Sequence, residues 1–261
     1  MSEVIVVTSG KGGVGKTTVA AFLGFGLANR GKRTIVCDMD FGLNNLDIVM
    51  GVENKIQFDV SDVLEGRCRA SQAFVECSIK NLFMISSARF FSDGQKCRDN
   101  IKGLFEGLRE NFDYVILDCP AGLDTGFHRA VSFADSAIAV VTPALSSMRD
   151  TDKALTVLRS YDLKKISLVV NMARGDLMFE KSMISVPDIE DILKTKVIGV
   201  IPYDDRILVS ESCRQFKEGI TAKALKNLTN AVMTGKIKYY NPESEYSGFK
   251  GSIKRSLRKI V

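Results

Sequence analysis

The strongest constraint on this chain is a glycine-rich stretch near its start. Residues 10–17 read GKGGVGKT and match the phosphate-binding pattern G-x-x-x-x-G-K-[ST]. The stretch follows an apolar, β-branched run at 3–8 and overlaps the start of a helical pattern at 14–29, so it joins a strand to a helix. A glycine loop at a helix N-terminus is an anion site, which indicates an α/β fold that binds nucleoside phosphates.

Each residue type in this loop has its own role. The glycines let backbone N–H groups turn toward phosphate oxygens, where side chains would collide. Lys16 is expected to reach the β- and γ-phosphates, and Thr17 to offer its hydroxyl to Mg²⁺. The alternative is a glycine-rich turn without a ligand. The predicted nucleotide-binding residues of the loop are Gly10, Lys11, Gly12, Gly13, Val14, Gly15, Lys16, Thr17 and Thr18.

The apolar run at 114–120, YVILDCP, supplies a matching acid. Asp118 sits at the end of this predicted strand, where a carboxylate can hold the magnesium shell through water. The neighbouring Cys119 is interpreted as a small residue at a strand end rather than as a reactive thiol.

The rest of the chain alternates apolar runs with helical patterns. Further strands are predicted at 33–40, 81–87, 136–143, 165–171 and 196–202, and helices at 98–110, 124–133, 147–160, 186–194 and 221–234. This alternation predicts an α/β fold of the P-loop NTPase type, a mostly parallel sheet with helices on both faces. We expect an ATPase domain at 1–238, a flexible linker at 239–247 and a C-terminal helix at 248–261.

Composition excludes several classes of protein. A chain of 261 residues suits one large α/β domain, and no apolar run reaches the roughly 18 residues needed to cross a bilayer. No secretory signal is visible, and the six cysteines form no CxxC pair, which indicates free thiols in a reducing cytoplasm. A single histidine, His128, argues against histidine catalysis or a zinc site.

The positive charge is concentrated at the C-terminus. The net charge is +5. Residues 246–261 hold five cations and no acid, so the rest of the chain has no net charge, which argues against a broad nucleic-acid surface. These cations are Lys250, Lys254, Arg255, Arg258 and Lys259.

Residues 248–261 are predicted to form an amphipathic helix. At about 100° per residue its apolar side chains fall within an arc of about 120°, and its length of about 20 Å is too short to span a bilayer. Such a helix would lie in the interface of an anionic membrane. Two alternatives remain, packing of the helix on its own domain and DNA binding. The predicted membrane residues are Phe249, Lys250, Ile253, Lys254, Leu257 and Ile260.

Several motifs resemble the deviant Walker A (MinD/ParA) family of ATPases, and within it the division-site ATPases. They are SGKGGVGKTT (9–18), CDMDFGLNNLDIVMG (37–51), LDCPAGLDTG (117–126) and VIGVIPYDD (197–205). The resemblance implies an Mg²⁺-dependent ATP hydrolase that forms a homodimer on binding ATP and regulates septum placement with MinC-like and MinE-like partners. It also implies a cytoplasmic protein that attaches to the cytoplasmic face of the inner membrane through its tail.

The same resemblance implies roles for individual residues. Lys11 is similar to the signature lysine that reaches the partner subunit's phosphates, and Asp40 to the aspartate that orients the attacking water. With Lys16 they form the predicted catalytic set. The other implied residues are Asp38 and Asn45 in the switch region, Asn171, Pro202 and Asp204 at the adenine, and Asp150 and Asp152 for partner docking. Met172 and Asn44 depart from the family pattern, since arginine is familiar at both positions.

Alternative functions stay open at this point. By spacing alone, Lys11 could instead be a solvated cation near the phosphate of its own subunit. The chain could also be a flagellar-number ATPase, or a DNA-partitioning ATPase, which would bind nonspecific DNA with ATP. An iron–sulfur carrier ATPase would need grouped cysteines at a dimer seam.

Overall fold

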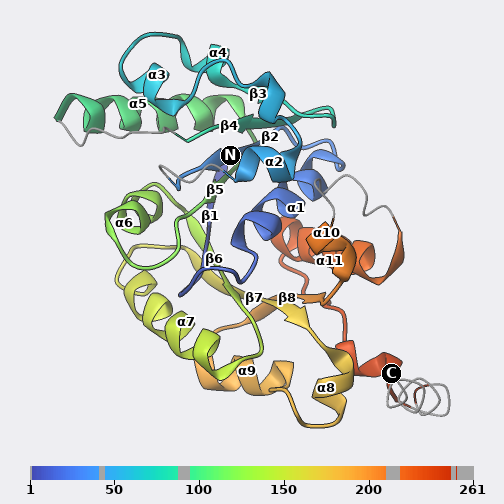
Figure 1. Ribbon diagram of the computed structural model, residues 1–261. Coiled ribbons are helices and arrows are strands. Elements are labelled where there is room, and N and C mark those ends of the chain that lie inside the picture. The colour runs from blue at the N-terminus through green and yellow to red at the C-terminus, as the bar shows by residue number, and fades with distance from the viewer. Residues whose placement is uncertain (1, 41–44, 88–94, 210–217, 248–250, 252–261) are drawn as a thin grey trace.

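The computed structural model describes residues 2–40, 45–87, 95–209, 218–247 and 251 (Figure 1). Within these ranges, eight strands form one sheet in the order β3-β4-β2-β5-β1-β6-β7-β8. Every strand pair except β3 with β4 is parallel, and all seven predicted strands are confirmed. The strands are β1 (Glu3–Thr8), β2 (Thr34–Asp38), β3 (Val75–Glu76), β4 (Leu82–Ile85), β5 (Tyr114–Asp118), β6 (Ser136–Val141), β7 (Lys165–Ala173) and β8 (Val197–Pro202).

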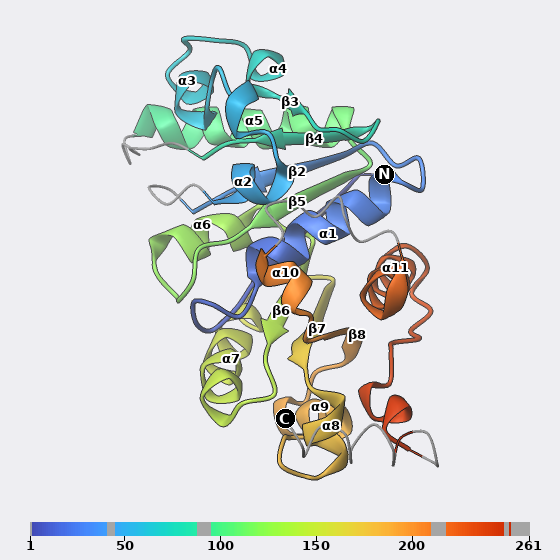
Figure 2. The same ribbon diagram turned by 45° about the vertical axis from the view of Figure 1, so that its right-hand side comes forward.

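Helices cover both faces of the sheet, as the alternation of patterns predicts (Figure 2). On one face, α1 (Lys16–Ala28) and α11 (Gly219–Thr234) pack over one apolar core. The opposite core is covered by α5 (Gln95–Asn111), α6 (Thr125–Ser132), α7 (Leu145–Leu158) and α9 (Val186–Leu193). The fold is therefore the expected three-layer α/β arrangement.

The short elements between β2 and β4 have no counterpart in the sequence prediction. They are α2 (Leu46–Met50), η1 (Glu53–Lys55), α3 (Val60–Leu64), α4 (Ala70–Ala73) and the antiparallel edge strand β3. The later α8 (Gly175–Phe179), α10 (Asp205–Val209) and η3 (Pro242–Glu245) are equally short. None spans two helical turns or a full strand alternation, so hydrophobic periodicity carries too few residues to reveal them.

The sheet brings three chain segments together at one edge. Strand β1 lies in the centre of the sheet between β5 and β6, and β5 pairs in register with both β1 and β2. In this register Asp118 is the partner of both Val7 and Asp38. Parallel strands end at the same edge, and ligands of open α/β sheets bind outside such carboxyl ends.

The end of the chain leaves the sheet beside α8. The predicted linker at 239–247 contains η3, which lies against α8. The predicted tail helix lies outside the described residues apart from Gly251, and with it all six predicted membrane residues, Phe249, Lys250, Ile253, Lys254, Leu257 and Ile260. Among the residues that the structure describes, no helix combines the length and apolar character that crossing a bilayer requires.

Candidate nucleotide site

The glycine loop connects β1 to α1 and is held from two sides. A Cβ on Gly10 would lie 2.1 Å from the carbonyl carbon of Asp150 on α7, so only glycine fits there. Gly15 has a φ of 88°, and a Cβ on it would lie 2.3 Å from the Asn171 amide nitrogen at the end of β7. The loop is thus clamped between α7 and β7, and glycine at both clamping positions is a steric requirement.

The outer side of the loop is open. Gly12 and Gly13 are exposed, and a Cβ on either would meet nothing within 4 Å. The loop leads into the first turn of α1, where Lys16, Thr17 and Thr18 stand at the positive end of the helix. An anion above the loop would therefore meet backbone N–H groups without displacing a side chain.

Lys16 is a buried cation at this site. The residue is 9% exposed. Burial raises the pKa of both Asp40 and Asp118, and the positive charge of Lys16 opposes this rise. A lysine is seldom buried unless an anion compensates it. The side chain is therefore poised for a negatively charged ligand.

Two buried carboxylates, Asp38 and Asp118, are register partners on the neighbouring strands β2 and β5. Burial raises the pKa of Asp118 to about 6, with the Thr17 hydroxyl and Lys16 opposing the rise. Burial and the neighbouring charge of Asp118 raise the pKa of Asp38 to about 8. Asp38 Oδ2 and Asp118 Oδ1 accept no hydrogen bond from any described residue. Buried oxygens without a partner are costly, which fits a cation that binds between these groups.

The donor set is suited to magnesium held together with phosphates. Oxygen ligands from Thr17 and the two aspartates match the preference of Mg²⁺, which keeps several waters and uses few protein ligands. The described ranges contain no group of three or more His, Cys, Asp or Glu side chains that could hold a metal ion.

Asp40 and Asn45 border the same edge from the loop after β2. The Asp40 N–H donates to Asp38 Oδ1 at 2.9 Å, which anchors the start of the loop on the carboxylate pair. The Asp40 pKa is raised, mainly by burial, and Lys16 opposes the rise. Asn45 is exposed and precedes α2 without capping it by its side chain. Asn44 lies outside the described residues.

Lys11 points away from the loop toward α7. Its Nζ donates to the Ser146 hydroxyl at 3.2 Å, and the side chain is half-exposed. Two residues of the first turns of α7 thus contact the phosphate loop, Ser146 through Lys11 and Asp150 through Gly10. The sequence prediction did not include Ser146, and a serine in a helix gives no signal by itself. Asp150 pairs with Lys153, and Asp152 is exposed on the same helix.

The predicted adenine elements meet at the ends of β7 and β8. Asn171 is buried and its amide donates to the Val14 carbonyl at 2.8 Å, so it also braces the phosphate loop. Pro202 is the register partner of Ala173. Arg206 and Thr221 donate hydrogen bonds to the Asp204 carboxylate. The bond from Arg206 is the main reason that the pKa of Asp204 falls to about 2.

Sequence reasoning missed a cation at this edge. Met172 has a left-handed φ of 56°, and two residues later the Arg174 guanidinium lies 5.6 Å from the centre of the Tyr203 ring. A basic residue just past the carboxyl end of a strand was the available signal. The strand edge therefore carries a guanidinium although position 172 does not.

Comparison with known proteins gives consistent matches. Residues 2–166 match a family model described as an AAA domain. The chain is 44% identical to the septum site-determining protein MinD of Synechocystis over 80% of this chain and 79% of that protein. It is 37% identical to MinD of Bacillus subtilis over 97% of both chains.

Solved structures agree with these relatives. A chain of the MinC:MinD cell division complex of Aquifex aeolicus superposes with a TM-score of 0.82 at 36% identity, over 91% of this chain and 98% of that one. MinD of Pyrococcus horikoshii, complexed with Mg-ADP, gives a TM-score of 0.77 at 27% identity, over 90% of this chain and 97% of that one. These matches confirm the resemblance seen in the motifs. The chain belongs to the MinD family of septum site-determining proteins.

Proposed function

We propose that this chain is an Mg²⁺-dependent ATPase that takes part in placing the division septum. The observation that carries the proposal is the pairing, at one sheet edge, of a buried lysine with two carboxylate oxygens that have no described partner. One half of this arrangement needs an anion and the other needs a cation. A magnesium–nucleotide complex satisfies both at once, and Mg-ADP is bound in the relative from Pyrococcus horikoshii.

Each residue then has a part in holding ATP. The loop from Gly10 to Gly15 would bind phosphate oxygens through its N–H groups, with Lys16 against the β- and γ-phosphates. Thr17 and Asp118 would hold the metal shell, and bound magnesium would neutralise charge on the phosphates. Asn171, Pro202 and Asp204 lie at the edge where the base would rest.

Hydrolysis would be completed by a second subunit. Asp40 would orient the attacking water, since it is tied to Asp38 at the carboxylate pair. Lys11 is half-exposed beside the open loop, so it can reach across to the γ-phosphate of a partner. Such a cation supplied in trans raises turnover by about 10³ to 10⁵ in related reactions. ATP would therefore drive dimerisation, and dimerisation would drive hydrolysis.

The variant Lys11→Ala tests the part played by the second subunit. We expect nucleotide binding to persist, while ATP-dependent dimerisation and stimulated hydrolysis are lost. The matched control is Lys223→Ala, which removes an exposed lysine of α11 far from the loop in sequence. Titration calorimetry, sedimentation and phosphate release measure the three properties. Normal ATPase activity in Lys11→Ala would disprove the role.

We further propose that the dimer attaches to the inner membrane through residues 248–261 and binds MinC-like and MinE-like partners. A MinD relative is solved in complex with MinC, and the exposed Asp152 with its neighbour Asp150 offers an acidic docking position on α7. Two weakly bound tails on one dimer gain about 10²- to 10⁴-fold in avidity. Flotation with anionic liposomes should show binding with ATP and little with ADP, whereas equal binding in both states would contradict the switch.

A further inference from the structure

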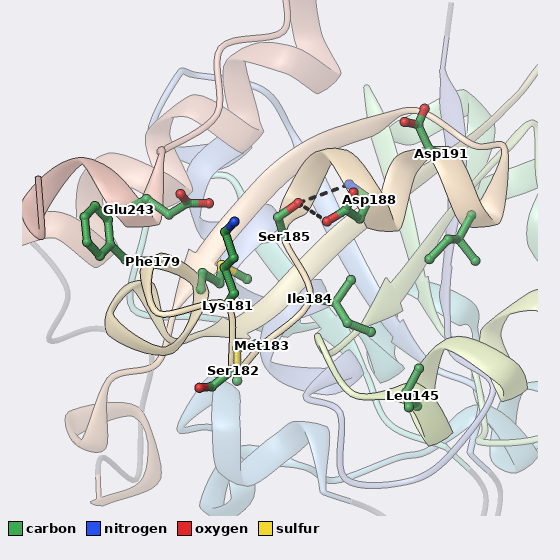
Figure 3. Close-up of a pocket in the computed structure, with 12 residues that line it drawn as sticks. Leu145, Phe179, Lys181, Ser182, Met183, Ile184, Ser185, Asp188, Asp191 and Glu243 are labelled. Atoms are coloured by element: carbon green, nitrogen blue, oxygen red, sulfur yellow. Dashed lines mark hydrogen bonds between the residues drawn. The ribbon is translucent and has the colours of Figure 1, made fainter.

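A groove of about 780 Å³ lies among α8, α9 and the start of α7, and none of its lining residues belongs to the nucleotide site described above. Figure 3 shows Phe179 and Glu243 on one side of it, Leu145 on the other and Ile184 between them. Its surface is contributed by three chain segments, which are the start of α7, residues 178–192 and η3. The groove is thus a feature of the folded chain rather than of one loop.

The groove exposes apolar surface that the fold leaves open. Leu145 and Ile192 are 77% and 58% exposed, and they are the two most exposed large apolar side chains among the described residues. Each exposed side chain of this kind forgoes most of the stabilisation that its burial would give. Apolar side chains gathered in a groove with a polar rim are typical of an interaction surface.

The rim of the groove is acidic. Asp188, Asp191 and Glu243 line it, and Lys181 is the one cation among its lining residues. Asp188 already accepts a hydrogen bond from the Ser185 hydroxyl at 2.5 Å. The surface therefore fits a ligand that is apolar on one side and basic on the other.

The chain enters this groove just before its basic tail. A Cβ on Gly175 would lie 1.9 Å from the Pro242 carbonyl oxygen, so η3 rests directly on the backbone of α8. Glu243, the next residue, lines the groove, and residue 248 follows five positions later. Five residues span at most about 18 Å. A tail tethered this closely has an effective concentration in the millimolar range at the groove.

We propose that residues 248–261 dock in this groove of their own subunit when no membrane is present. Their sequence provides an apolar stripe led by Phe249 and five cations without an acid, which complements the apolar floor and acidic rim. The inference rests on the proposed membrane attachment, because the same stripe would bind either the groove or the lipid. Docking would hold the tail back from membranes until binding by a dimer outweighs it.

Photo-crosslinking in the full-length protein tests the docking directly. With Leu257→benzoylphenylalanine, irradiation without lipid should give crosslinks within one chain to the segment 178–192, identified by mass spectrometry. The control is Arg255→benzoylphenylalanine, which lies about 200° around the helix from 257 and should crosslink there at least several-fold less. Crosslinks that join two chains and increase with concentration would overturn the proposal and assign the groove to a second copy.

A vesicle assay tests the consequence. Ile192→Glu should raise nucleotide-free binding to anionic phosphatidylglycerol vesicles about 5- to 10-fold, if the tail is docked in most molecules. Ile220→Glu, at an isoleucine that is 40% exposed on α11, should leave it unchanged. Equal binding of the two variants, together with no crosslinks to 178–192, overturns the docking. Crosslinks to the groove without vesicle binding by any variant support the docking and disprove the membrane function.

Discussion

The nucleotide site and the α8–α9 groove depart from normal burial in opposite directions. At the carboxyl edge of the sheet, Lys16, Asp38 and Asp118 are buried ionisable side chains. In the groove, Leu145 and Ile192 are exposed apolar side chains. Ionisable side chains are usually solvated, and large apolar side chains are usually covered. In each region the folded chain therefore leaves side chains in an unfavourable environment.

The kind of side chain that is left in an unfavourable environment indicates the kind of ligand. Buried charges of both signs call for a compact ligand that also carries both signs, as a magnesium–nucleotide complex does. Exposed apolar groups beneath an acidic rim call for an amphipathic basic segment. The first region should respond strongly to the loss of one side chain, since little water can replace it. The second should respond weakly.

The largest effect is expected from Lys16→Ala. Without this cation, buried phosphates would lose a charge-assisted partner worth about 3 kcal/mol, which lowers affinity for MgATP about 100-fold or more. Isothermal titration measures the change, and Lys223→Ala on exposed α11 is the control. A loss below threefold would mean that Lys16 does not contact the nucleotide.

An intermediate effect is expected from Asp38→Asn in the nucleotide-free protein. The Asp38 pKa is raised from 3.8 to about 8, so between these pH values the folded chain keeps a proton that the unfolded chain releases. Wild-type stability should therefore fall as pH rises through this window. An asparagine amide does not titrate, so the variant avoids this loss. The free energy of unfolding of Asp38→Asn relative to wild type should therefore be about 2 kcal/mol higher at pH 8 than at pH 5.

Urea unfolding at the two pH values measures this gain. Asp162→Asn, which changes an exposed carboxylate beyond the site, should show no such pH-dependent gain. A gain for Asp38→Asn that is equal at both pH values would show that the charge pair is not its cause.

The smallest effect is expected from Leu145→Ser in the groove. Because this side chain is mostly exposed, the free energy of unfolding should change by about 0.5 kcal/mol or less. Leu155→Ser, at a fully buried position of the same helix, should cost about 3 kcal/mol or more. Thermal unfolding of both variants makes the comparison. A large loss at Leu145 would mean that the groove is part of the core.

Local patterns in the sequence predicted most of the fold. The seven long strands and the larger helices were confirmed because each contains enough residues to display its hydrophobic period. The short elements between β2 and β4, and the antiparallel edge strand β3, contain too few. Their conformation follows from packing against neighbours that are distant in the sequence.

The candidate site divides in the same way. The sequence alone predicts the phosphate loop, Lys16, Thr17 and Asp118 as site residues, because the chemistry needs those residue types at fixed local spacing. Arg174 and Ser146 were not, since their relation to Tyr203 and to Lys11 exists only after β7, β8 and α7 have assembled.

By itself, the sequence determined that this chain binds phosphates from a strand–loop–helix unit and carries a basic amphipathic end. These are properties of neighbouring residues. Only the tertiary structure decided that Asp38 and Asp118 lie together at one buried sheet edge with unpaired carboxylate oxygens, and that Glu243 of η3 lines an apolar groove with an acidic rim. Both depend on which strands and helices lie side by side, and the pairing of distant segments is fixed by the packing of the whole core.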